Sequence, residues 1–192
     1  MPQPISLDRM VRAVEKVRER LMRAAAALEG AGIPYAVAGG NAVAAWVSTV
    51  DEAAVRNTRD VDVLVRRGDM ASIREALESA GFTYRHVAGM DVFLDSPEGS
   101  VRDGVHLIFA GERVRDHEPE PNPVLAAANA SAGFRVLPLR DLVTIKLTAY
   151  RDKDRTHLRD MLEVGLIDST WVSGLPSELG NRLQALIDDP NG

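Results

Sequence analysis

The stretches GGN at residues 39–41 and TRDVDVLV at residues 58–65 decide how this chain folds. The apolar run PYAVA at 34–38 precedes the first stretch, and its short, partly β-branched composition predicts a buried strand. The glycines then turn the chain into an apolar helix over 42–50. In DVDVLV, acidic and apolar residues alternate with period two before a run of valine and leucine, which predicts a second strand with one charged end. Together they specify strand, glycine turn, helix, loop and strand.

Other apolar patterns predict the rest of the secondary structure. Ser6 can cap a long first helix that Gly30 and Gly32 end. The apolar residues of this helix recur at helical spacing: Met10, Val11, Val14, Val17, Leu21, Ala24, Ala25 and Leu28. The remaining predicted elements are helices over 69–80, 139–164 and 176–187 and strands over 82–86, 90–94 and 105–109. The sequence contains no internal repeat.

The segment GERVRDHEPEPNP at 111–123 is acidic and proline-rich, a composition that resists regular structure. It predicts a soft boundary between a strand-containing core at 1–115 and a helical C-terminal part at 116–192 that packs on this core. A chain of 192 residues can bury one good core and at most a small second lobe, so the two parts can also form a single domain.

The composition limits the possible functions. The chain has 28 acidic and 23 basic residues and a net charge of −5, so no global field draws it to nucleic acid or anionic membranes. It has no cysteine, so a metal would be bound through carboxylates or histidine. The first residues lack the apolar core of a signal peptide, and no run of about 18 apolar residues is present to span a bilayer. We therefore expect a cytoplasmic protein that does not bind membranes.

Asp60 and Asp62 are the first candidates for chemistry. Residues two apart on a strand point to the same face, with their carbons roughly 6 to 7 Å apart. Two carboxylates so placed repel each other, and Mg²⁺ relieves this repulsion because it is commonly held by one or two carboxylates plus the phosphate oxygens of a substrate. Phosphoryl and nucleotidyl transfer need that arrangement, since the metal positions the triphosphate and neutralises charge that develops in the transition state.

Gly39 and Gly40 are candidates for binding the phosphates. Lacking side chains, they let the backbone approach a phosphate closely, while N–H groups at the start of the following helix favour an anion. Asn41 can add a side-chain hydrogen bond. Each motif also has a structural interpretation, because a D-x-D triplet is commonly a solvated strand end and a glycine pair commonly a turn or helix cap. Their occurrence together in one strand–turn–helix–loop–strand unit favours the functional interpretation.

A family resemblance follows from these motifs. GGN at 39–41 followed by TRDVDVLV at 58–65 resembles the signature of the nucleotidyltransferase superfamily, which is GG or GS, a spacer and D-x-D. The run 33–65 and the stretch PLRDLVTIKLTAYRDKDRTHLRDMLE at 138–163 resemble, more specifically, the AbiEii-like nucleotidyltransferases. The resemblance covers most of the chain. It implies an α/β (α+β) fold, in which a mixed sheet is flanked by helices and followed by a helical C-terminal part.

The resemblance also implies an activity. Members transfer a nucleoside monophosphate from an NTP to a hydroxyl of an acceptor, often RNA such as tRNA, with Mg²⁺ (or Mn²⁺) as cofactor. By this resemblance Asp60 and Asp62 are metal ligands, and Gly39 and Gly40 lie at the phosphates. Some AbiEii-like members are toxins, which implies an antitoxin protein as a partner.

The strand GVHLIF departs from the family pattern. Many members carry a third carboxylate on a later strand, next to the first two, where it acts as ligand or base. If 105–109 is that strand, His106 occupies the carboxylate position. Neutral imidazole can ligate a metal or accept a proton, but losing an anion weakens a Mg²⁺ site, which prefers oxygen. His106 can equally be a hydrogen-bonded histidine at the edge of the core, and Asp103 is an alternative carboxylate.

Two charged residues of the C-terminal part complete the candidates. Lys146 lies on the apolar stripe of its predicted helix, so its ammonium group either reaches water along its stem or points into the cleft and neutralises a triphosphate. The resemblance favours the second role. The dense charged run 151–160 is by default a solvated helix face. Asp160 is the exception in this run, because it matches a late aspartate of the family.

The sequence thus predicts a nucleotidyltransferase with two groups of site residues. The catalytic residues are Asp60, Asp62, His106, Lys146 and Asp160, and the nucleotide-binding residues are Gly39, Gly40, Asn41 and Lys146. The rival hypothesis is a catalytically weakened member that binds nucleotide or a partner protein without turnover, which the histidine in place of the third carboxylate suggests. A third hypothesis is a structural domain in which the motif occurs by chance, and such a domain would bind no nucleotide.

Overall fold

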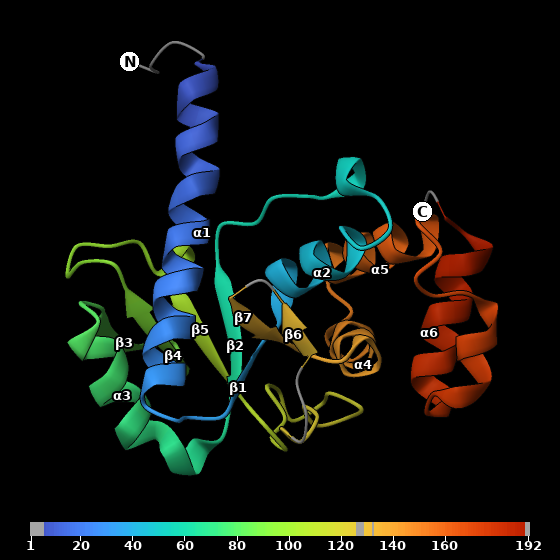
Figure 1. The fold of residues 1–192 in the computed structure, drawn as a ribbon. Coiled ribbons are helices and arrows are strands. Elements are labelled where there is room, and N and C mark those ends of the chain that lie inside the picture. Colours follow the sequence, from blue (N-terminus) through green and yellow to red (C-terminus); the bar gives the residue numbers. More distant parts are fainter. Residues whose placement is uncertain (1–5, 126–128, 132, 191–192) are drawn as a thin grey trace.

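A computed structural model describes residues 6–125, 129–131 and 133–190, in which helices flank both faces of a mixed sheet (Figure 1). The helices are α1 Leu7–Gly30, α2 Gly39–Val47, α3 Met70–Ser79, α4 Leu139–Ala149, α5 Asp152–Glu163 and α6 Ser177–Asp188. The strands are β1 Tyr35–Val37, β2 Val61–Val65, β3 Thr83–Val87, β4 Met90–Leu94, β5 Val105–Phe109, β6 Asn129–Ser131 and β7 Phe134–Val136. Short 3-10 turns are η1 Glu52–Ala54, η2 Arg67–Asp69, η3 Val101–Asp103 and η4 Ser169–Gly174. The expected mixed sheet flanked by helices is confirmed.

The strand order in the described chain is β3-β4-β5-β2-β1-β7-β6. In the centre, β2 runs antiparallel to β1 and parallel to β5. The last two strands at one end of the sheet, β7 and the edge strand β6, lie in a stretch where the sequence analysis predicts no strand. Each has only three residues, too few for an alternating pattern to appear. β7 extends the sheet parallel to β1 through the pair Val37 and Val136.

Alternation along the strands divides the core between the two faces of the sheet. Val61, Val63 and Val65 of β2 pack with α1 and α3. Leu64 points to the other face and packs with α2, α4, α5 and α6. Since side chains alternate, Asp62 lies on the face of Leu64, under the C-terminal helices. The two groups of helices lie on opposite sides of the sheet in Figure 1.

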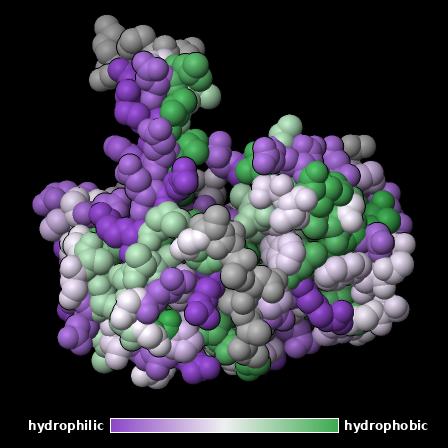
Figure 2. All heavy atoms as spheres, in the orientation of Figure 1, coloured by the Kyte–Doolittle hydropathy of each residue, from purple (hydrophilic) through white to green (hydrophobic). Residues whose placement is uncertain are grey.

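The first helix is only partly a core element, which corrects the predicted apolar stripe. Leu21, Ala24, Ala25 and Leu28 are buried, whereas Met10, Val11 and Val14 are 64%, 47% and 43% exposed. The physical reason is length, because the 24 residues of α1 span roughly 36 Å and its N-terminal half projects beyond the sheet (Figure 1). Figure 2 shows apolar surface along one side of this projection.

The helical region 139–164 consists of two helices with a sharp break. Tyr150 adopts the left-handed conformation, with φ of 47°, and ends α4. The Arg182 guanidinium group donates hydrogen bonds to the carbonyl oxygens of Leu147 and Thr148, at 2.7 and 2.8 Å, and so binds carbonyl groups in the last turn of α4. The break turns α5 back so that its first turn faces Lys146 of α4.

None of the helices in the described part of the chain is both long and apolar enough to cross a membrane. The predicted division into parts 1–115 and 116–192 stays a prediction.

Candidate active site

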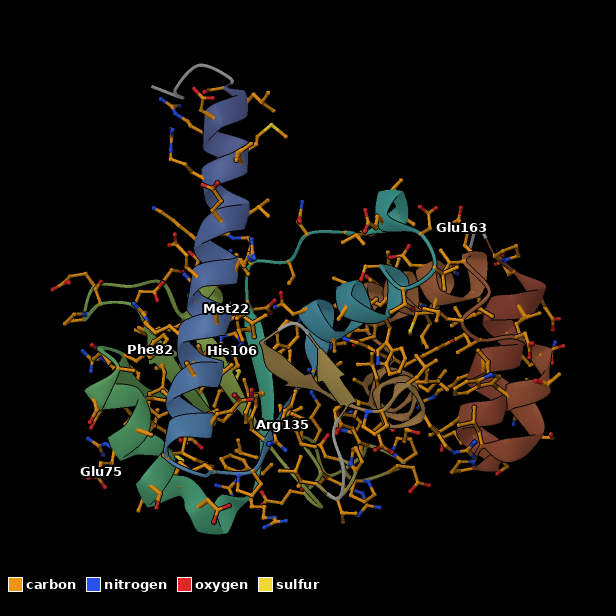
Figure 3. All side chains as sticks on the ribbon, viewed as in Figure 1. Met22, Glu75, Phe82, His106, Arg135 and Glu163 are labelled. Atoms are coloured by element: carbon orange, nitrogen blue, oxygen red, sulfur yellow. The ribbon has the colours of Figure 1, made fainter. Side chains whose placement is uncertain are left out.

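The pairing of β2 with β5 brings three predicted site residues together. Asp62 is the register partner of His106 across the parallel strands, so both side chains stand on the same face. Asp60 immediately precedes β2 and points the same way. One ligand atom from each of the three side chains lies within 4.8 Å of the others. His106 lies on β5, in the central part of the sheet (Figure 3).

Hydrogen bonds to the surrounding chain hold these side chains in place. Thr58 donates from Oγ1 to Asp60 Oδ1 at 2.5 Å, and Asn41 donates from Nδ2 to the Asp60 carbonyl oxygen at 2.8 Å. His106 Nε2 lies 2.6 Å from the carbonyl oxygen of Val101. A carbonyl oxygen can only accept, so Nε2 carries the proton. In the neutral ring Nδ1 is therefore unprotonated, and it faces Asp62 Oδ1 at 3.5 Å.

The glycine pair at the start of α2 packs against these carboxylates. Gly39 has φ of +62°, and a Cβ atom there would lie 1.9 Å from Asp62 Oδ2. At Gly40 a Cβ atom would lie 2.8 Å from the Cβ atom of Thr58. A side chain at Gly39 would displace Asp62, and one at Gly40 would displace Thr58. The glycines thus allow the start of α2 to lie directly over Asp62.

Asp60, Asp62 and His106 form a group that we call the acidic cluster. A cleft of about 320 Å³ contains this cluster and runs along β5. Gly39, Asp60, Asp62, His106 and Lys146 all line it, which brings together five of the predicted site residues. Gly40 and Asn41 are next to Gly39 on α2. Two further cations, Arg151 and Lys153, also line the cleft, and Lys153 Nζ lies 3.7 Å from Asp60 Oδ2.

Lys146 is held inside the protein and does not extend to water. Its side chain is 3% exposed, and Nζ lies 3.0 Å from Asp154 Oδ1. The other oxygen of Asp154 accepts a hydrogen bond from Arg151 Nε at 2.7 Å. The predicted solvated face at 151–160 is therefore wrong for Asp154, which is 1% exposed. The sequence provides no signal of the pair formed by Lys146 and Asp154. No glycine or proline marks the break between α4 and α5 that brings the two residues together.

The charges of this cleft shift the pKa values of its acids. Burial raises the pKa of Asp62, but the protonated form of His106, which can donate from Nδ1, and the charge of Lys146 outweigh burial, so that the pKa of Asp62 lies below its usual range. Burial likewise opposes ionisation of Asp154, but its pKa is lowered by Arg151 and Lys146. The pKa of His106 is raised by Asp62. Asp62 and Asp154 are accordingly carboxylates at neutral pH.

Asp160 and Asp103 lie outside the acidic cluster. Asp160 pairs with Arg56 Nε at 2.8 Å and does not line the cleft. Arg56 belongs to the loop that leads into Asp60, so this ion pair ties the loop to α5. Asp103 pairs with Arg59 Nη2 at 2.9 Å at the end of η3. The structure thus places His106, and not Asp103, beside the two aspartates.

The residues present fit a divalent cation. Two carboxylates and an unprotonated imidazole nitrogen offer three ligand atoms. The hydrogen bonds with Thr58 and with the Val101 carbonyl oxygen orient Asp60 and His106. The adjoining cleft leaves room for further ligands such as phosphate oxygens.

A mixed sheet with a glycine pair at the start of a helix and a D-x-D strand at one cleft defines a nucleotidyltransferase-fold protein. The chain belongs to the family described as uncharacterised nucleotidyltransferase, whose model matches residues 7–161. Members of this superfamily use an NTP and a divalent metal.

Solved structures of the antibiotic-resistance factor ANT(2'')-Ia are similar to this chain. Its solution structure matches with a TM-score of 0.52 at 15% identity, over 95% of this chain and 93% of that chain. A crystal structure of ANT(2'')-Ia in complex with adenylyl-2''-tobramycin matches with a TM-score of 0.48 at 14% identity, over 96% and 99% of the two chains. At this identity the likeness shows the fold alone. No curated protein matches the chain.

Proposed function

We propose that this protein transfers a nucleoside monophosphate from an NTP to a hydroxyl group of an acceptor, with Mg²⁺ or a related divalent ion at Asp60 and Asp62. The observation that carries the proposal is the convergence of Asp60, Asp62, His106 and Lys146 on one cleft. Four residues from three separate elements meet there, and each type suits a triphosphate with its metal.

The reaction joins the acceptor oxygen to the α-phosphorus and breaks the bond between that phosphorus and the oxygen leading to the β-phosphorus, so pyrophosphate leaves. When bound, the cation would neutralise the triphosphate and the charge that develops on it. Gly39 leaves the start of α2 open to the phosphates, where N–H groups favour an anion. Lys146, Arg151 and Lys153 add positive charge along the same cleft.

The role of Lys146 depends on its partner. The hydrogen-bonded ion pair with Asp154, at 3.0 Å, holds the Lys146 side chain in position in a site of low exposure. We propose that Lys146 contacts the triphosphate and that Asp154 is its positioning residue. In this proposal Asp160 does not contact the substrate. It positions Asp60, because its ion pair with Arg56 fixes the loop before that residue.

The acceptor and the biological role rest on resemblance. We propose RNA, including tRNA, as the acceptor and an AbiEii-like, toxin-type role with an antitoxin partner, because 33–65 and 138–163 resemble that subfamily. A small polyhydroxyl compound is the other acceptor class to test, since a protein of similar fold is an antibiotic-resistance factor.

A thermal-shift titration tests the nucleotide site. The wild type and Asp60→Asn/Asp62→Asn are titrated with each of the four NTPs, with and without Mg²⁺ or Mn²⁺. We expect metal-dependent stabilisation in the wild type and none in the double variant. The matched control is Asp188→Asn/Asp189→Asn, which removes the same charge from an exposed pair at the end of α6 and should bind as the wild type does. If no NTP changes the melting temperature of any of the three proteins, the proposal is wrong.

An assay of label transfer distinguishes an enzyme from a catalytically weakened protein that only binds nucleotide. The histidine in place of a third carboxylate is the observation that favours the second alternative. Radiolabel on the α-phosphate should appear on the acceptor, and label on the γ-phosphate should not. Total RNA and aminoglycosides serve as the first acceptors. Stabilisation by NTP without label on any acceptor would support the non-catalytic alternative.

A further inference from the structure

The acidic cluster contains a histidine beside its two aspartates. It therefore offers two carboxylates and one imidazole to a metal ion. His106 has two possible roles at this position, as a metal ligand or as the base that takes the hydroxyl proton. The geometry around its ring distinguishes between them.

The imidazole ring is oriented as in a metal-ligating histidine. Such histidines usually donate the second ring N–H to a carboxylate or a backbone carbonyl, which fixes the tautomer and the direction of the free lone pair. His106 does so through Nε2, which lies 2.6 Å from the Val101 carbonyl oxygen. Its backbone is fixed as well, because β5 pairs with β2 on one side and with β4 on the other. Nδ1 consequently points at the carboxylates and at the space between them.

The difference between nitrogen and oxygen ligands bears on which cation the site prefers. Mg²⁺ is hard, prefers oxygen ligands and gains most from anionic ones. A neutral imidazole offers nitrogen and one negative charge fewer than a third carboxylate would. Mn²⁺ accepts imidazole nitrogen more readily and still suits the oxygen-rich remainder of the site, which is two carboxylates and the phosphates.

We propose that His106 ligates the metal through Nδ1 and that the site formed by Asp60, Asp62 and His106 therefore binds Mn²⁺ in preference to Mg²⁺. This inference rests on the proposed function, since it concerns the metal of the same site. It also assigns the proton of the acceptor hydroxyl to water, because Nδ1 is occupied by the metal.

Binding of Mn²⁺ alone, measured by electron paramagnetic resonance, tests the proposal. The free Mn²⁺ signal gives the affinity, competition with Mg²⁺ gives the preference, and pulsed spectra report nitrogen coupling to the bound ion. We expect nitrogen coupling in the wild type and an affinity for Mn²⁺ at least about tenfold above that for Mg²⁺. This effect is as large as that of replacing a residue that hydrogen-bonds to a metal ligand.

Two substitutions provide the comparison. His106→Asp restores a third carboxylate, so it should abolish the nitrogen coupling and reduce the preference for Mn²⁺ by about tenfold. His86→Gln is the matched control, because His86 lies on exposed β3 beside Asp91, outside the acidic cluster, and should change neither quantity. Retention of the nitrogen coupling in His106→Asp would overturn the proposal, because the nitrogen ligand would then come from another residue.

The outcomes separate this inference from the proposed function. Bound Mn²⁺ without nitrogen coupling, or equal affinity for the two ions, would overturn the metal assignment and return His106 to the role of base, while NTP stabilisation and label transfer would still support the enzyme. If the wild type binds neither ion with or without NTP, both proposals fail. If His106→Asp does not fold, the wild-type spectrum alone decides, because the coupling is either present or absent there.

Discussion

At the scale of single residues, Gly39 is under two constraints that a comparison with Gly32 can separate. Its φ is +62°, which is strained for any other residue, and a Cβ atom would meet Asp62. Gly32 has nearly the same φ, +66°, but no atom lies within 4 Å of the position its Cβ would take. The pair therefore separates backbone strain from the clash with the carboxylate.

We expect Gly32→Ala to cost about 1 kcal/mol of unfolding free energy and to leave NTP binding intact. Gly39→Ala should abolish metal-dependent stabilisation by NTP, because the added carbon displaces Asp62. Urea unfolding and thermal shift measure the two effects. Equal NTP binding by both variants would show that the start of α2 is not part of the site.

Asp154 allows a second test at this scale. Asp154→Asn leaves Lys146 buried without its anion, and breaking such a pair typically costs about 3–5 kcal/mol. Replacing both members, as in Lys146→Met/Asp154→Leu, should restore much of that stability, since a well-packed apolar pair is often as stable as a buried ion pair.

The double variant separates structure from function. If Lys146 contacts the triphosphate, the stable double variant still loses NTP binding, as a titration of its melting temperature would reveal. Normal NTP affinity in that variant would limit the pair to a structural role.

At the scale of elements, α1 consists of two halves with different roles. Leu21 and Leu28 are buried against the sheet, whereas Met10 and Val14 lie on the half that projects into solvent. Leu28→Ala should cost about 2–5 kcal/mol because it leaves a cavity, and Met10→Gln should change the unfolding free energy by less than about 0.5 kcal/mol. Chemical denaturation of the two variants compares them, and a large loss in Met10→Gln would show that the projecting half is covered in solution.

At the scale of the whole molecule, the half-buried His157 affects stability against acid. Burial lowers the pKa of His157 to about 4, and repulsion from Lys146 adds to the effect. In the unfolded chain the pKa returns to the ordinary value of 6.5. Between pH 6.5 and 4 the unfolded state binds a proton that the folded state does not, so the unfolding free energy falls as the pH is lowered, by on the order of 2–3 kcal/mol.

Urea unfolding across this window checks the prediction. His157→Gln should show a shallower fall than the wild type between pH 6.5 and 4.5. The carboxyl groups of Asp62 and Asp154, whose pKa values are lowered, contribute below their ordinary value of 3.8 and so fall outside this window. Parallel curves for the two proteins would show that His157 is already free to ionise in the fold.

Much of the architecture could be predicted because it depends on local pattern. Alternation in DVDVLV predicts both the strand and the common face of Asp60 and Asp62, and the strands 90–94 and 105–109 lie where their composition predicts them. The change from strand to helix at 39–41 could also be predicted, since glycines there follow an apolar strand, although α2 already begins at Gly39 and not at residue 42. These features depend on residues within a few positions of one another, which is the range over which backbone periodicity acts.

Contacts between distant segments required the tertiary structure. The sequence placed His106 opposite the aspartates only through a family pattern, and the register of β2 with β5 decided it. Lys146 pairs with Asp154 because Tyr150 turns the chain, and nothing in the local sequence marks that left-handed residue. The exposure of Met10 depends on where the sheet ends, although its helical spacing is the same as that of a core residue. Periodicity determines which face a side chain takes, but only packing determines what covers that face.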